Sequence, residues 1–81
     1  MTYEQAVPII ENILDDKQVE YTPSLNAFPA WRNDTFEWGF FNDHKGVLKF
    51  SCFNIENNYE EIYHIPVTDN FKQILELLEN N

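Results

Sequence analysis

The sequence predicts an α+β domain in which an N-terminal and a C-terminal helix flank a three-stranded antiparallel β-meander. Apolar residues recur at helical spacing near both ends of the chain and alternate with polar residues in its middle. Short turn sequences separate the alternating segments. The chain has 81 residues, which is the size of one domain, so we expect residues 1–81 to form a single small acidic α+β unit.

The first helix is expected over Thr2–Asp16. Its apolar stripe follows the i, i+3, i+4, i+7 rule and consists of Ala6, Ile9, Ile10, Ile13 and Leu14. Thr2 and Gln5 have the spacing of a capping box, which marks a helix start. Pro8 conflicts with that start, because a proline beyond the first turn should kink the helix. A start near Gln5 or Ala6 removes the conflict, so the sequence leaves the first turn open.

The segment after this helix combines turn-forming and aromatic residues. We expect a short extra strand at Val19–Thr22 and then a loop over Thr22–Asn33. The turn-forming residues of that loop are Pro23, Ser24, Asn26, Pro29 and Asn33. Phe28 and Trp31 are expected to cap the core, as aromatic side chains usually do. Together with Arg32 they are also candidates for partner recognition, because Trp and Arg are frequent at interface hot spots.

Alternation of apolar and polar residues predicts strands over Thr35–Phe41, Val47–Phe53 and Tyr59–Val67. The first connection, residues 42–46, contains Gly46, which suits a positive φ. Residues 54–58 form the second connection, and a proline near the end of the third strand suggests an edge position. A second helix follows, capped by Asp69 or Thr68. Its apolar stripe is Phe71, Ile74, Leu75 and Leu78.

Turn lengths suggest a register. Pairing Phe41 with Val47 places Trp38 opposite Phe50 and gathers one apolar face, made of Phe36, Trp38, Phe40, Leu48, Phe50 and Cys52. The same rule across the second turn pairs Phe53 with Tyr59 and puts His64 beside Leu48 on this inner face. The opposite face would carry Phe41, Val47, Phe53, Tyr59, Tyr63 and Ile65, which is more apolar than a solvent-facing sheet normally is.

This second face needs a cover, because two helices can cover only one face of the sheet. We expect residues 19–33 to cover it, or a homodimer contact to do so. A dedicated partner site is the alternative, since a large uncovered apolar patch marks an interaction surface.

Charge and composition exclude several classes of protein. With 14 acidic and five basic residues, the formal charge is −9. That charge disfavours direct binding to nucleic acid and attracts basic proteins, although solubility is the simpler explanation of it. One cysteine, no signal-peptide pattern and no long apolar run indicate a cytoplasmic protein without a membrane segment.

No motif for catalysis or metal binding is present. There is no nucleophile motif and no glycine-rich phosphate loop. Cys52 is expected to be a small buried hydrophobe, although neighbouring strands could bring it near His64. Asp43, His44 and His64 match no metal-binding spacing. We therefore expect no enzymatic activity, no metal and no cofactor.

The remaining interpretation is a non-enzymatic module that binds a basic or nucleic-acid-binding protein. The candidate binding residues are Phe28, Trp31, Arg32, Glu37, Glu56, Tyr59, Glu60, Glu61 and Tyr63. The carboxylates among them are expected to cluster around one strand face and turn. The alternative is a small-molecule-binding or sequestering protein, with an aromatic pocket between the sheet and residues 19–33.

In size, acidity and element order, the chain resembles small phage-encoded inhibitors of bacterial defence nucleases, including anti-CRISPR proteins. The resemblance covers these three properties and no sequence motif. It implies an inhibitor that imitates nucleic acid in the host cytoplasm, its carboxylates standing where phosphates would. A toxin-immunity protein would share the same three properties.

Overall fold

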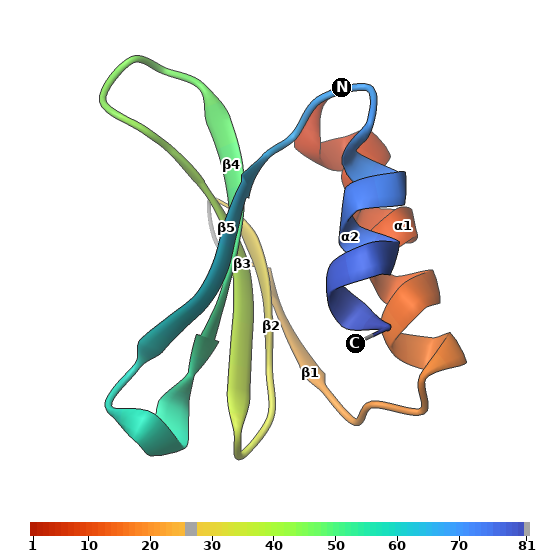
Figure 1. Cartoon of the computed structure of the whole chain (residues 1–81), viewed down its shortest axis with the longest axis vertical. Helices are drawn as coiled ribbons and strands as arrows, with labels where there is room; N and C mark the ends of the chain where they lie inside the picture. The colour runs from red at the N-terminus through yellow and green to blue at the C-terminus, as the bar shows by residue number, and fades with distance from the viewer. Residues whose placement is uncertain (26–27, 81) are drawn as a thin grey trace.

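The computed structural model describes residues 1–25 and 28–80 (Figure 1). The elements follow in the order α1 (Tyr3–Asp16), β1 (Thr22–Leu25), β2 (Pro29–Arg32), β3 (Phe36–Asn42), β4 (Leu48–Asn54), η1 (Ile55–Asn57), β5 (Glu60–Pro66) and α2 (Phe71–Glu79). The strands form one antiparallel sheet in sequence order. The α+β class is thus confirmed, but the sheet has five strands where we expected a three-stranded meander.

Helix α1 begins with the predicted capping box. Thr2 Oγ1 accepts a hydrogen bond from the backbone N–H of Gln5 at 3.3 Å, and Gln5 Oε1 accepts one from the N–H of Thr2 at 2.9 Å. The helix therefore starts at Tyr3 and contains Pro8, whose side chain is exposed. The buried side of α1 consists of Ala6, Ile10, Ile13 and Leu14.

The predicted loop at 22–33 is instead a hairpin that enlarges the sheet. The expected extra strand at 19–22 is wrong in position, because β1 begins where that segment ends. Trp31 pairs with Trp38 across β2 and β3 and packs its ring against Phe40 and Phe50. Pro23 is tolerated because β1 is an edge strand. Asn26, which we expected in a turn, lies outside the described residues.

The turn between β3 and β4 lies one residue further along the chain than expected, which shifts the register by two residues. Asp43 Oδ1 accepts hydrogen bonds from the N–H groups of Lys45 (2.8 Å) and Val47 (2.9 Å). Gly46 closes the turn with a φ of 79°, as predicted. Phe40 therefore faces Phe50, and Trp38 faces Cys52. A shift by two keeps every side chain on its face, so the predicted inner face survives.

The predicted register between β4 and β5 is wrong, and the error places the side chains of residues 63–65 on the opposite face of the sheet from the one observed. Cys52 pairs with Tyr63 but Phe53 pairs with Glu61, so a β-bulge leaves Ile62 as an extra residue. Tyr63 therefore lies on the inner face, as Ile65 does, and His64 lies on the outer face opposite Ser51. The inner-face position expected for His64 is thereby corrected.

One core lies between the sheet and the helices. Both helices cover the same face of the sheet (Figure 1). The buried apolar residues are Ala6, Ile10, Ile13, Leu14, Trp31, Trp38, Phe40, Phe50, Cys52, Val67, Phe71 and Leu75. The segment at 19–33 extends the sheet and does not cover its second face, contrary to expectation. That outer face carries half-buried Phe41 and Phe53 with no helix over it.

Candidate functional site

The topology brings many acidic residues to one end of the molecule. The ends of α1 and α2, the β2–β3 turn and the connection between β4 and β5 all lie towards this end, in the lower half of Figure 1. Five acids belong to the strand ends and turns there, and we call them the acidic edge: Asp34, Glu37, Glu56, Glu60 and Glu61. Neither helix has a basic residue in its last turn to offset them.

An apolar side chain lies between two of these acids on the outer face. Glu37 pairs with Phe53 across β3 and β4, and Phe53 pairs with Glu61 across β4 and β5. The phenyl ring is half-buried and the Glu61 side chain is exposed. Exposed Arg32 pairs with Glu37 from β2 and is the nearest cation in this row of the sheet.

Local hydrogen bonds hold the other two glutamates of this edge. Thr35 Oγ1 donates to Glu56 Oε1 at 2.6 Å, and Asn57 Nδ2 donates to a carboxylate oxygen of Glu60. Between them, Tyr59 is 53% exposed and has a φ of 58°. Glu37, Glu56, Tyr59, Glu60 and Glu61 thus lie at the same end of the sheet, but Glu60 and Glu61 are neighbours on β5 and point to opposite faces.

The other candidate residues lie in or against the core. Trp31 is only 1% exposed, and its indole N–H donates to Glu11 Oε2 at 3.0 Å. Phe28 is half-buried and meets Tyr3 edge to face, with ring centroids 5.9 Å apart. Tyr63 lies on the inner face with the core aromatics. None of these three belongs to the acidic edge.

A pocket of about 470 Å³ opens beside this edge, between the sheet and the ends of both helices. It is lined by Lys17, Val19, Glu20, Asn33, Thr35, Phe36, Trp38, Cys52, Ile62, Tyr63, Leu78 and Glu79. Glu79 Oε1 accepts hydrogen bonds from the indole N–H of Trp38, at 3.1 Å, and from the hydroxyl of Tyr63. The sequence placed an aromatic pocket near residues 19–33 but gave no signal for Glu79, which reaches the pocket from the end of α2.

Burial in this region keeps two ionisable groups neutral. Desolvation, reinforced by the charge of Glu79, raises the pKa of Cys52 to about 12. Desolvation, with the charge and the hydrogen bond of Glu79, raises the pKa of Tyr63 well above its usual value. Cys52 is therefore a thiol at neutral pH and a poor nucleophile. The pair expected with His64 does not form, because His64 lies on the opposite face.

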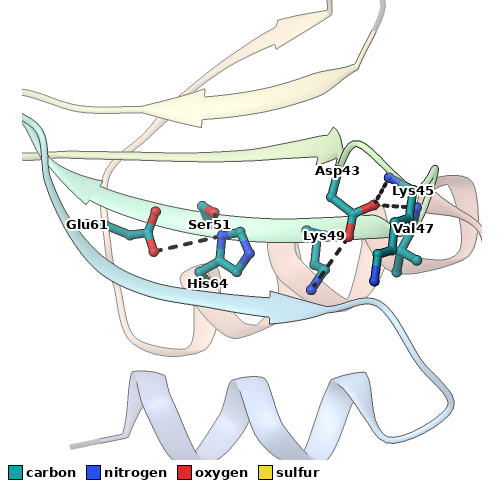
Figure 2. Close-up of polar contacts among 7 residues, drawn as sticks. All are labelled: Asp43, Lys45, Val47, Lys49, Ser51, Glu61 and His64. Carbon is teal, nitrogen blue, oxygen red and sulfur yellow. Dashed lines mark hydrogen bonds and ion pairs between the residues drawn. The ribbon is translucent and has the colours of Figure 1, made fainter.

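Serine, histidine and glutamate meet on the outer face (Figure 2). Ser51 Oγ lies 3.3 Å from His64 Nδ1, and Glu61 Oε1 lies 3.8 Å from the same nitrogen. In a hydrolytic triad the nucleophile and the acid contact different ring nitrogens. Ser51 is also fully buried. This geometry does not favour acyl transfer, and the sequence missed the cluster because it placed His64 on the inner face.

The chain matches no family model, and neither a curated protein nor a solved structure is significantly similar to it. Within residues 1–25 and 28–80, no three His, Cys, Asp or Glu residues are grouped so that they would hold a metal ion. The helices of this part of the chain are also too short or too polar to cross a membrane.

Proposed function

We propose that this protein is a non-enzymatic binding module whose acidic edge engages a basic surface of a nucleic-acid-binding protein. One observation carries the proposal: the register of β3, β4 and β5 sets Glu37 and Glu61 on either side of Phe53 on the uncovered face. An apolar centre with a charged rim is the usual anatomy of a protein interface.

Charge supports this choice of partner. Three further carboxylates lie around this row, one each from the β2–β3 turn, the β4–β5 connection and β5, and Arg32 of β2 is the cation that pairs with Glu37 in it. A basic surface complements this field, which accelerates association and suppresses acidic partners. Nucleic-acid-binding proteins present such surfaces, because they bind phosphates with Lys and Arg.

The finer form of the proposal is imitation of nucleic acid. The carboxylates of the acidic edge would occupy the places of phosphates on an enzyme such as a defence nuclease or a toxin. Exposed Tyr59 and half-buried Phe53 would supply apolar contact within the charged surface. The protein would then act as an inhibitor or an immunity protein in the bacterial cytoplasm.

Two double variants of equal charge change test the proposal. Glu60→Gln with Glu61→Gln removes two charges from the acidic edge. Glu4→Gln with Asp69→Asn removes two charges from exposed sites near the starts of α1 and α2. Each tagged variant is used for capture from a bacterial lysate at low and high salt, and mass spectrometry identifies what is retained.

The proposal expects a nucleic-acid-binding protein to be retained by the parent and by the Glu4/Asp69 variant at low salt. The Glu60/Glu61 variant should retain much less of it, and high salt should release it. Equal retention by both variants would contradict binding through this edge. Capture of no nucleic-acid-binding protein would contradict the choice of partner.

A further inference from the structure

The pocket beside the acidic edge is lined largely by apolar side chains, with the carboxylate of Glu79 among them. Its lining includes the aromatic residues Phe36, Trp38 and Tyr63 and the aliphatic residues Val19, Ile62 and Leu78. The rings of Phe36 and Trp38 are 5.7 Å apart and tilted by 45°. Its volume of about 470 Å³ falls in the range of small-molecule sites, about 300–1,000 Å³.

Glu79 is fixed within this pocket by two aromatic donors. Both hydrogen bonds, from Trp38 and Tyr63, go to Oε1. The other oxygen, Oε2, accepts no hydrogen bond from the described residues. The carboxylate is therefore held in one orientation with an acceptor left for a ligand. Fixing it in advance lowers the entropy that binding would otherwise cost.

The surrounding field favours a positive ligand. Glu20 lines the same pocket, and the C-terminal ends of α1 and α2 lie beside it with no basic residue in either last turn. A helix C-terminus carries a partial negative charge that favours cations. Lys17 is the one cation among the lining residues, and its side chain is exposed.

We propose that this pocket binds an organic cation, an amine or guanidinium group carried on an apolar body. The aromatic walls would receive the body and attract the charge through their π faces. Glu79 Oε2 would accept a hydrogen bond from the charged group. A metal ion fits poorly, because it requires several converging oxygen, nitrogen or sulfur ligands. Carboxylate or phosphate ligands would be repelled. This inference does not rest on the proposed function.

Three probes of the same shape separate charge from apolar burial. Benzylamine is a cation, benzyl alcohol is neutral and benzoate is an anion at pH 7. Each is titrated into ¹⁵N-labelled protein while the indole N–H signals are followed. Trp38 lines the pocket, whereas Trp31 is buried elsewhere and serves as an internal control. We expect benzylamine to shift the Trp38 signal and bind at least about tenfold more tightly than the other two probes.

Substitutions then test whether the carboxylate of Glu79 attracts the cationic probe. Glu79→Gln keeps an acceptor for Trp38 and Tyr63 but removes the charge, and should weaken benzylamine binding about tenfold or more. Glu76→Gln, one turn earlier on α2 and outside the pocket lining, should leave it unchanged. Lys17→Gln should strengthen it, because the competing cation is gone. If the Glu79→Gln variant still bound benzylamine at least about tenfold more tightly than the other two probes, the role given to this carboxylate would be overturned.

The source of the cation is resolved by a second comparison, between benzylamine and N-acetyl-arginine amide. Tighter binding of the arginine derivative indicates a basic side chain of a protein, and tighter binding of benzylamine indicates a free amine. Both results support an organic-cation site. Equal binding of benzylamine and benzyl alcohol would overturn the proposal, and so would the absence of any Trp38 shift.

Discussion

The two faces of the sheet should respond differently to the same substitution. Phe50 is 0% exposed and its ring lies 5.1–6.4 Å from the rings of Phe40, Phe71, Tyr63 and Trp31. Leucine has three fewer side-chain carbon atoms than phenylalanine, and each buried carbon group contributes about 0.8 kcal/mol. Phe50→Leu should therefore cost about 2 kcal/mol of the free energy of unfolding.

Phe53 provides the matched control, because it lies three residues further along β4 and faces the uncovered side. It is half-buried, so Phe53→Leu should cost less than about 1 kcal/mol. Both variants should still fold, since a chain of this length typically has about 4–12 kcal/mol of stability.

Urea unfolding measures both costs. For a small protein the free energy falls by roughly 1 kcal/mol for each molar of urea. The midpoint should drop by about 2 M for Phe50→Leu and by less than about 1 M for Phe53→Leu. It should not depend on protein concentration. Equal losses, or a midpoint that rises with concentration, would show that a second copy covers the outer face and would refute this assignment of the core.

Three other sites give predictions of their own. Gly46→Ala should cost about 1 kcal/mol in urea unfolding, because an added Cβ meets no atom within 4 Å but the φ is positive; Gly39→Ala, whose Cβ would meet Ala30 Cβ at an ordinary 3.6 Å, should cost less. At pH 8, alkylation of Cys52 should be about 10³-fold slower in the native than in the unfolded protein, because a pKa of about 12 leaves that much less thiolate than an ordinary value near 9. A raised thiol pKa stabilises the fold below about pH 9, so the urea midpoint should fall as pH rises from about 9 towards 12. Backbone hydrogen bonds, chiefly from Val47, lower the pKa of Asp43, so the turn should be stable at neutral pH and loosen only below about pH 4, which amide exchange at Val47 would detect. A native thiol that reacts as fast as the unfolded one, or a turn that loosens near pH 5, would contradict these assignments.

Much of the fold could be predicted because local chemistry determined it. The capping box of Thr2 and Gln5 and the apolar stripes identified both helices. Alternation identified β3, β4 and β5, and the apolar face of β3 and β4 survived a register error because the error was two residues. Gly46 marked its turn correctly.

The sequence could not reveal the bulge or the first hairpin. The bulge at Ile62 depends on how the β4–β5 connection closes, where Asn58 and Tyr59 both adopt positive φ. A tyrosine at positive φ has no sequence signal. In the first hairpin, prolines in two strands of only four residues gave a loop-like pattern. Tertiary packing of Trp31 against Phe40 and Phe50 outweighed that pattern.

The site was predictable only in part, for related reasons. Glu56, Glu60 and Glu61 are close in sequence, and Glu37 joins them because β3, β4 and β5 are neighbours, an order that the sequence predicted although its register was wrong. Glu79 reaches its pocket from the far end of the chain, through a long-range contact with Trp38. The aromatic character of Phe28 and Trp31 suggested recognition, but Trp31 lies in the core.

If the acidic edge imitates nucleic acid, as we propose, it occupies the nucleic-acid-binding surface of its partner. The most direct test is competition: the captured partner, held on the immobilised protein at low salt, is challenged with duplex DNA or RNA and with an equal concentration of a neutral polymer. We expect release by the nucleic acid alone, and weaker initial binding to the Glu60→Gln, Glu61→Gln variant. A partner that stays bound in excess nucleic acid, with equal affinity for that variant, would contradict it.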